Sequence, residues 1–218
     1  MVSEIQGIGM TSRRTRMRLV QRLREGGIKD ERVLQAIAET PRHIFLDEAL
    51  SHRSYEDTAL PIGYQQTLSQ PYIVARMTEI LMEFQPKRVL ELGTGSGYQA
   101  AILAHLVDDV FSVERIKPLL DKARERMRAL SYRNVQLRHS DGGMGWPEQG
   151  PFDGIIVTAA PSRVPEGLLP QLADGGVMVA PIGEGTQMLT RIVRRGSGYD
   201  TSEIEPVRFV PLLGGVVR

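Results

Sequence analysis

The sequence predicts an α/β fold with a doubly wound, mostly parallel sheet, helices on both faces and an N-terminal helical extension. From Val89 onward, short apolar runs of β-forming residues alternate with helical stretches, which is typical of parallel strands joined by crossover helices. A glycine-rich loop follows the first of these runs, where a parallel sheet commonly holds a ligand. The first third of the chain has a helical pattern instead.

Two helices are expected in the N-terminal third, separated by Gly26 and Gly27. The first covers residues 10–23, and the second follows Asp30, which is a suitable N-cap. Many arginines occur in the first helix. Helical spacing scatters them around much of its surface, so we interpret them as a solvated face and not as an arm that binds nucleic acid.

Five strands of the parallel sheet and two further β-like runs are expected after these helices. They cover residues 89–92, 110–113, 135–137, 155–157 and 177–180, followed by 189–193 and 207–210. The boundary between the two parts is expected near Pro86. Residues 1–85 then form the extension, packed on a core of residues 86–218.

Composition narrows the class of protein. A chain of 218 residues with 41% hydrophobic content can bury one substantial core. Its net charge of +1 gives no general affinity for nucleic acid, and no apolar run of about 20 residues is present to span a membrane. Cysteine is absent and the 4 histidines show no ligand spacing, so no metal site is expected. We expect a monomeric, cytoplasmic protein.

The glycine-rich loop contains the pattern E-x-G-x-G-x-G over residues 91–97. A P-loop would need Lys and then Ser or Thr after its last glycine, but Tyr98 and Gln99 follow here. A dinucleotide fingerprint would need its third glycine at the position of Tyr98. The pattern instead resembles the first motif of S-adenosylmethionine-dependent methyltransferases. The loop alone leaves open an incidental turn or another nucleotide site.

Glu114 ends the second expected strand, about 20 residues after the loop. In doubly wound folds an acid at this place accepts hydrogen bonds from both ribose hydroxyls of a bound nucleoside. The alternatives are a solvated strand end or an ion pair with Arg115 or Lys117. We expect the ribose contact.

A polar, irregular loop over residues 59–71 precedes the next expected helix. Taken alone, it is explained by helix capping, because Ser69 or Gln70 can cap a helix that Pro71 opens.

Motifs along most of the chain, from the helix near Glu31 to Gly215, together resemble the protein-L-isoaspartate O-methyltransferase family. They are Leu60-Pro61-Ile62-Gly63, Gln66-Thr67-Leu68-Ser69-Gln70-Pro71, the glycine loop, Thr158-Ala159-Ala160-Pro161 and Phe209-Val210-Pro211-Leu212. The resemblance implies a Rossmann-like methyltransferase sheet. It also implies transfer of a methyl group from S-adenosylmethionine to the free carboxyl of isoaspartyl residues, which initiates repair of damaged proteins through a succinimide.

The resemblance also implies the site residues. Ser69 matches the residue treated as catalytic. The implied cofactor contacts are Glu91, Gly93, Thr94, Gly95, Ser96, Glu114, Asp141 and Gly142. The implied contacts to the substrate peptide are Leu60, Pro61, Ile62, Thr67, Leu68, Gln70, Val210 and Leu212. The sequence departs from the family pattern at Gln65, where glycine is usual, at Leu68, where isoleucine is usual, and over residues 140–143.

The implied chemistry needs no strong base, because a carboxyl group of pKa about 4 is already ionised at neutral pH. Ser69 is then expected to position the carboxylate by hydrogen bonding. Two other functions are weighed against this one. A methyltransferase acting on tRNA or another small substrate could use the same cofactor half, and a non-catalytic, cofactor-binding interaction protein could dispense with Ser69.

Overall fold

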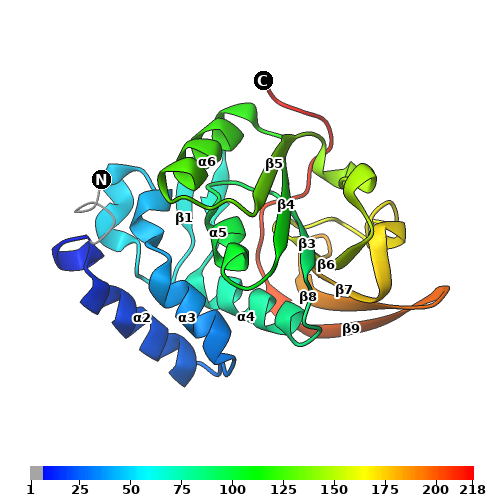
Figure 1. Cartoon of the computed structure of the whole chain (residues 1–218), viewed down its shortest axis with the longest axis horizontal. Coiled ribbons are helices and arrows are strands. Elements are labelled where there is room, and N and C mark those ends of the chain that lie inside the picture. Colours follow the sequence, from blue (N-terminus) through cyan, green and yellow to red (C-terminus); the bar gives the residue numbers. More distant parts are fainter. Residues whose placement is uncertain (1–6) are drawn as a thin grey trace.

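The computed structural model describes residues 7–218 and contains a seven-stranded sheet with helices packed against it (Figure 1). The strand order is β5-β4-β3-β6-β7-β8-β9. The strands β3 (Arg88–Leu92), β4 (Asp109–Glu114), β5 (Val135–His139) and β6 (Phe152–Val157) are parallel to one another and to β7 (Leu172–Ile182). The last two, β8 (Gln187–Arg195) and β9 (Gly198–Val207), are antiparallel to their neighbours. The predicted doubly wound, mostly parallel sheet is confirmed.

The two faces of the sheet are covered differently. One face packs against the α-helices α4 (Pro71–Met82), α5 (Tyr98–Ala104) and α6 (Lys117–Ala129). The helices α2 (Arg13–Glu25) and α3 (Glu31–Glu39) pack on α4, and α3 also packs on α5. The other face is covered by loops and the short 3₁₀ helices η4 (Gly142–Met144), η5 (Pro147–Gln149) and η6 (Leu169–Gln171). Residues alternate between these faces along β3, with Val89 in one cluster and Leu90 in the other. The helices expected on the second face are therefore only single turns.

The N-terminal helices begin at identifiable caps. The Asp30 side chain accepts a hydrogen bond from the Arg32 backbone N–H, so the expected N-cap of α3 is confirmed. Ser12 caps α2, which starts three residues later than expected and is preceded by η1 (Gly9–Thr11). Two more 3₁₀ segments, η2 (Arg42–Phe45) and η3 (Glu48–Arg53), lead toward the polar loop.

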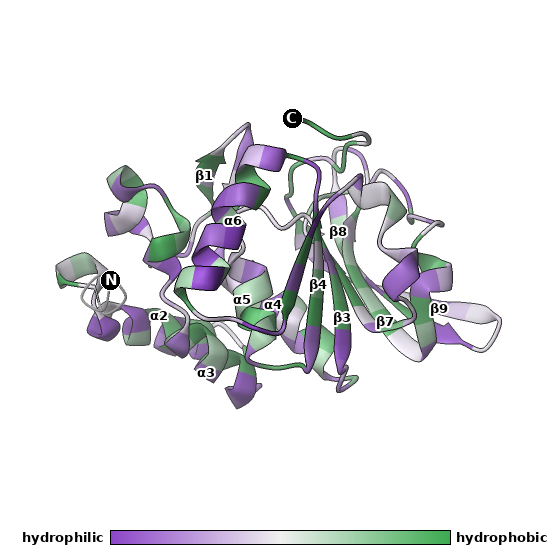
Figure 2. Cartoon of the chain, turned by 45° about the horizontal axis from the view of Figure 1, so that its top comes forward, coloured by the Kyte–Doolittle hydropathy of each residue, from purple (hydrophilic) through white to green (hydrophobic). Residues whose placement is uncertain are grey.

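One hydrophobic cluster crosses the expected boundary near Pro86. It joins Leu19 and Val33 of the N-terminal helices to Val89 and Val177 of the sheet. The division into residues 1–85 and 86–218 stays a prediction, because both parts share this core. Figure 2 shows hydrophobic residues along the middle of β3 and β4 and hydrophilic residues on the outer side of α6.

The expected strand over residues 207–210 is wrong beyond its first residue. The strand β9 ends at Val207, and the Gln187 side chain bonds both the N–H and the C=O of Phe209, which draws the chain out of the sheet. The residues that do form β9 are mostly polar because it is an edge strand with exposed side chains. The sequence of β9 has no apolar pattern from which the strand could be predicted.

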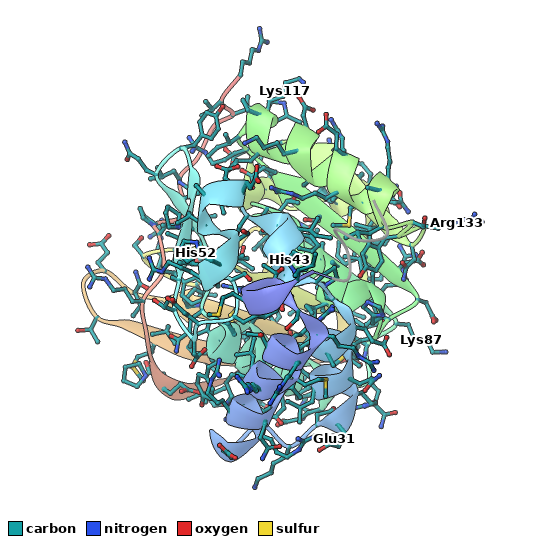
Figure 3. All side chains as sticks on the ribbon, turned by 90° about the vertical axis from the view of Figure 1, so that its left-hand side faces the viewer. Glu31, His43, His52, Lys87, Lys117 and Arg133 are labelled. Atoms are coloured by element: carbon teal, nitrogen blue, oxygen red, sulfur yellow. The ribbon has the colours of Figure 1, made fainter. Side chains whose placement is uncertain are left out.

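The polar loop before α4 is more regular than expected. It forms a two-stranded antiparallel hairpin of β1 (Leu60–Gly63) and β2 (Gln66–Leu68). Charged side chains such as Glu31, Lys87, Lys117 and Arg133 lie at the periphery of the molecule (Figure 3). No helix within residues 7–218 combines the length and the apolar character required to cross a bilayer.

Candidate functional site

The glycine-rich loop joins the carboxyl end of β3 to α5, at the edge where the strand order reverses. Open α/β sheets bind ligands in the crevice at such a point. A side chain at Gly93 would place its Cβ 2.5 Å from the Thr158 hydroxyl, and the backbone there has φ +97°. Only glycine fits this combination. Gly93, Thr94, Gly95 and Ser96 all line the pocket above the loop.

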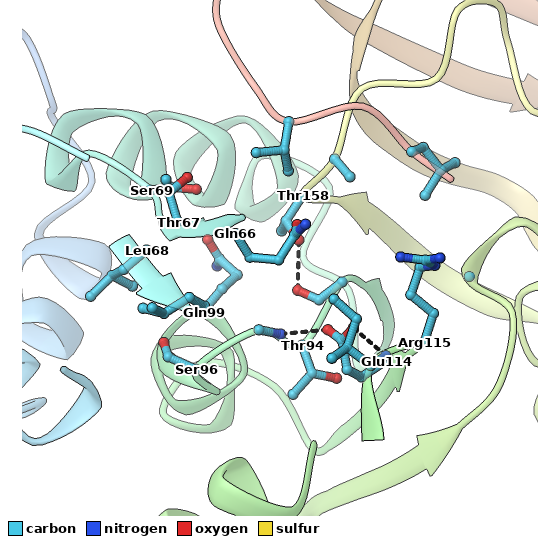
Figure 4. Close-up of a pocket in the computed structure, with 18 of the residues that line it drawn as sticks. Gln66, Thr67, Leu68, Ser69, Thr94, Ser96, Gln99, Glu114, Arg115 and Thr158 are labelled. Atoms are coloured by element: carbon cyan, nitrogen blue, oxygen red, sulfur yellow. Dashed lines mark hydrogen bonds between the residues drawn. The ribbon is translucent and has the colours of Figure 1, made fainter. Parts of the chain in front are cut away.

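Glu114 lies across the pocket from Ser69 and is anchored by the backbone (Figure 4). Its side chain accepts hydrogen bonds from the N–H groups of Gly95 at 2.8 Å and Ile116 at 2.9 Å. It is only 5% exposed, and Lys117 pairs instead with Asp121. The alternatives of a solvated strand end and an ion pair with Arg115 or Lys117 are not what the structure contains. Each carboxylate oxygen can still accept a further bond from a ligand hydroxyl.

Glu91 does not line the pocket. Its side chain is fully buried and accepts a hydrogen bond from the Ser112 hydroxyl, which lies 2.6 Å from the Thr94 hydroxyl. Burial raises the pKa of Glu91 to about 8, so the carboxyl is mostly protonated at neutral pH. Glu91 therefore supports Thr94 through the Ser112 hydroxyl. The structure does not place Glu91 where it could contact a cofactor directly.

Asp141 and Gly142, two neighbouring residues predicted as cofactor contacts, have different places in the structure. Gly142 lines the pocket, whereas Asp141 fastens the C-terminal segment beside it. The Asp141 carboxylate accepts hydrogen bonds from the backbone N–H of Gly143 at 2.8 Å and of Gly215 at 2.6 Å. Asp141 thus ties η4 to the C-terminal segment beside the pocket and does not line the pocket itself.

Ser69 follows the β1–β2 hairpin and lies two residues before the start of α4. The hairpin turns through Tyr64 and Gln65, whose φ angles are 54° and 58°. Gln65 thus adopts a left-handed conformation that glycine takes at lower cost, which explains why glycine is usual at this position.

The alternative explanation of this loop, capping of α4 by Ser69 or Gln70, is not what the structure contains. Neither side chain caps the helix; the Asp57 carboxylate accepts the Tyr72 N–H at 2.8 Å and the Gln70 side-chain amide at 3.0 Å. An acid from the preceding loop has taken the capping role, which leaves Ser69 free for another one. Among the residues that the structure describes, the Ser69 hydroxyl makes no hydrogen bond.

Two pockets meet at Ser69. The first lies over the glycine loop and also contains Ile62, Leu68 and Leu212. The second lies outside it, against Gln70, Ile73 and Phe209. Thr67, Ser69, Thr158 and Val210 line both pockets.

Leu60 and Pro61, predicted as substrate contacts, line neither pocket. The Leu60 side chain is buried in the main hydrophobic cluster, and Pro61 is exposed on the hairpin. Side chains alternate along a strand, so Ile62 shares the buried face of β1 with Leu60, and it is Ile62 that lines the first pocket.

Thr158 belongs to the site but was not among the predicted site residues. Its hydroxyl lies 2.9 Å from the Leu92 carbonyl oxygen and 2.7 Å from that of Gly93 (Figure 4). The available signal was a polar residue at the end of an apolar strand. Its relevance depends on β6 lying beside β3, which one sequence does not show. Gln99 and Arg115 also line the first pocket and were not predicted to do so.

Comparisons with known proteins agree on one family. The family model described as protein-L-isoaspartate(D-aspartate) O-methyltransferase matches residues 14–217. The chain is 68% identical over 218 residues, and over the full length of both proteins, to protein-L-isoaspartate O-methyltransferase 1 of Marinobacter nauticus. It is 61% identical to the protein-L-isoaspartate O-methyltransferase of Saccharophagus degradans, covering 99% of this chain and 98% of that protein.

Solved structures give the same result at lower identity. A protein-L-isoaspartate O-methyltransferase superimposes with a TM-score of 0.83 at 29% identity, over 92% of this chain and 67% of the other. A putative enzyme of the same name from Plasmodium falciparum, in complex with S-adenosyl-L-homocysteine, gives a TM-score of 0.81 at 27% identity. That match covers 91% of this chain and 98% of the other.

Proposed function

The chain belongs to the protein-L-isoaspartate(D-aspartate) O-methyltransferase family, and we propose that its reaction takes place at Ser69, where the two pockets meet. It is an S-adenosylmethionine-dependent enzyme that methylates the free carboxyl of isoaspartyl residues, which initiates repair of damaged proteins through a succinimide. The observation that carries the proposal is that Ser69 and Thr67 line both pockets at once.

The first pocket is the proposed cofactor site. The glycines of the loop let a ligand approach the backbone, and the anchored Glu114 carboxylate fits two ribose hydroxyls. Thr94, Ser96 and Gly142 complete the polar part of the wall. S-adenosylmethionine supplies an electrophilic methyl group on a sulfonium centre. This set of donors and acceptors suits a neutral-to-cationic nucleoside better than a phosphate, because Glu114 faces the pocket.

The second pocket is the proposed peptide site. Its wall combines the apolar Ile73, Phe209 and Val210 with the hydroxyls of Thr67 and Ser69. The Ser69 hydroxyl donates a hydrogen bond to the substrate carboxylate, which is already ionised, and holds one oxygen toward the first pocket. No proton is removed from the carboxyl at neutral pH, so Ser69 acts by position and forms no covalent bond with the substrate.

Location, assembly and partners beyond the substrate are part of the same proposal: a monomer in the cytoplasm that does not bind nucleic acid. Three arginines of α2 support the last point because they are engaged within the protein. Arg16 and Arg22 donate to the backbone carbonyls of Glu39 and Tyr55, and Arg24 pairs with Glu31.

A labelling assay with peptides and, in parallel, with tRNA tests the substrate. The protein is incubated with labelled S-adenosylmethionine and matched peptides that differ only in aspartate or isoaspartate. We expect base-labile label on the isoaspartyl peptide alone. Label transfer to tRNA with none to the isoaspartyl peptide would instead support the nucleic-acid alternative, and cofactor binding without any transfer would support an interaction protein.

The role of Ser69 is tested by Ser69→Ala. We expect kcat for the isoaspartyl peptide to fall by about 10-fold or more, with cofactor affinity unchanged, because the lost hydrogen bond is to a charged group. Ser197→Ala, at the exposed tip between β8 and β9, is the matched control and should leave both quantities unchanged. An equal loss of turnover and cofactor affinity in Ser69→Ala would contradict a role on the substrate side.

A further inference from the structure

Arg42 is the largest fully buried side chain in the part of the chain that the structure describes. A buried guanidinium normally has a carboxylate partner, because removing a charge from water is costly. Within residues 7–218 no acid forms an ion pair with Arg42. Its hydrogen bonds go to backbone carbonyl oxygens instead: Nε donates to Ser54 at 2.8 Å and Nη2 donates to Ser69 at 2.9 Å.

The same guanidinium also contacts the helix that follows the glycine loop. Its carbon Cζ lies 5.0 Å from the centre of the Tyr98 ring. Tyr98 is the first residue of α5 and is 1% exposed. One rigid, planar group therefore touches the backbone of Ser69 and the start of the helix that carries the cofactor loop.

Asp57 holds the same segment from its other side. Its carboxylate accepts the Gln70 side-chain amide and the Tyr72 N–H, the next residues after Ser69 in the chain. Arg42 and Asp57 thus fix the backbone at positions 69 and 72, so the Ser69 side chain has little freedom to shift toward or away from the loop.

We propose that Arg42 is a positioning residue of the methyl transfer, which holds the Ser69 carbonyl against Tyr98 and so fixes the Ser69 hydroxyl relative to the cofactor loop. This inference rests on the proposed role of Ser69. Alignment of the acceptor oxygen with the methyl carbon and sulfur determines the rate, and a misplacement of about 1 Å can cost about 100-fold. Packing alone does not explain Arg42, because an apolar side chain of similar volume would fill the same space without burying a charge.

The first test is Arg42→Lys, with Arg16→Lys as a matched control. Lysine keeps the charge but has one ammonium group in place of a fork that reaches two carbonyls. Arg16 is also a buried arginine of the N-terminal segment, at 6% exposed, and it donates to the Glu39 carbonyl and not to the segment that contains Ser69. We expect Arg42→Lys to lower kcat by about 10- to 100-fold per folded molecule while cofactor affinity stays within a few-fold. Arg16→Lys should leave both unchanged.

The second test combines Arg42→Lys with Ser69→Ala. If Arg42 acts through Ser69, the double variant should lose little more turnover than Ser69→Ala alone. The inference would be overturned if the loss of kcat in the double variant equalled the product of the two single losses. It would also be overturned by an unchanged kcat in folded Arg42→Lys, or by an equal fall in the kcat and the cofactor affinity of that variant. An unchanged kcat in Ser69→Ala would instead overturn the proposed role of Ser69 itself.

If Arg42→Lys does not fold, Arg42→Met takes its place in the single and the double variant, since methionine keeps the apolar contact with Tyr98.

Asp57→Ala gives an independent check at an exposed residue. It should lower kcat in wild type and have little effect in Ser69→Ala, because it frees the same segment. If the loss of kcat in the variant that combines Asp57→Ala with Ser69→Ala equalled the product of the two single losses, the inference would be overturned as well.

Discussion

Glu114 combines a structural and a proposed binding role in a single carboxylate. Its side chain orders the loop by accepting the Gly95 and Ile116 N–H groups, so Glu114→Ala would disturb the loop as well as the site. Glu114→Gln disturbs the loop less, since it keeps the volume of the side chain and one of the two acceptor oxygens, and so loses one of the two backbone bonds. We expect cofactor affinity to fall by about 10- to 100-fold in calorimetry. Glu125→Gln, an exposed acid on α6, is the control. Unchanged affinity in Glu114→Gln would remove Glu114 from the proposed cofactor contacts.

Glu91 makes stability depend on pH in an unusual direction for an acid. Burial raises its pKa from 4.5 to about 8, so between these values the folded chain holds a proton that the unfolded chain releases. The free energy of unfolding therefore falls as the pH rises from about 4.5 to about 8 and levels off above it. Glu91→Gln mimics the protonated acid, so we expect its Tm to vary less between pH 5 and pH 8.5 than that of the wild type. Parallel curves of Tm against pH would contradict this.

Residues that act through their side chains in a contiguous motif were predictable, and residues that act through the backbone of another segment were not. Ser69 and Glu114 lie within or beside recognisable patterns. Arg42 reaches the site through the Ser69 carbonyl and the Tyr98 ring, and the bond of Asp57 that fixes the start of α4 is to the Tyr72 N–H. No side-chain pattern in a single sequence reports such a bond, because every residue has a backbone carbonyl and almost every residue has an N–H.

At the scale of elements, the junction of the glycine loop with α5 is held against α6. Gly97 has φ +91°, and a Cβ there would meet the Met127 side chain at 2.9 Å. Gly97→Ala therefore adds a clash to the backbone strain. The control Gly27→Ala has a similar φ of +105° with open space around it, so it carries strain alone.

We expect Gly27→Ala to lower the free energy of unfolding by about 1–2 kcal/mol and Gly97→Ala to lower it by about 1–3 kcal/mol more. Denaturant unfolding of the two variants measures the difference. Equal values would show that α6 moves aside at no cost.

Strands with apolar runs were predicted well, because burial on both sides of a parallel sheet requires such runs. The edge strand β9 was missed for the opposite reason, because its exposed side chains carry no apolar signal. The β1–β2 hairpin was missed because its strands of 4 and 3 residues are too short to show an alternating pattern. The second face was overpredicted as helical, since single 3₁₀ turns at η4, η5 and η6 suffice to cover it.

At the scale of the whole molecule, the site depends on strand order. The loop after β3 meets Thr158 and Glu114 because β6 and β4 are the neighbours of β3. The fold class followed from alternation, but this order depends on long-range pairing that one sequence does not display. The resemblance to a family supplied the missing link between Ser69 and the loop.

The C-terminal segment closes the site across these strand ends, and its removal is the last prediction. Beyond β9 the chain pairs with Ala160 through Val210 and Leu212, and then with Lys117 through Val217. Truncation after Val207 leaves the sheet intact but removes Val210 and Leu212 from the pocket walls. We expect cofactor affinity to fall by about 10-fold or more, because a buried Val or Leu contributes about 1.5–3 kcal/mol, and we expect peptide turnover to be lost with it.

Truncation after Leu213 tests whether the segment acts through Val210 and Leu212 in the pocket walls or through the bonds that residues 214–218 make to the rest of the protein. It removes only residues 214–218, including the contacts of Gly215 with Asp141 and of Val217 with Lys117, and keeps the pocket walls. Cofactor affinity should then stay within a few-fold of wild type in calorimetry. If both truncated proteins bind the cofactor as tightly as the full chain, the segment does not contribute to the first pocket. Any loss of turnover would then come from the second pocket, which the segment also lines.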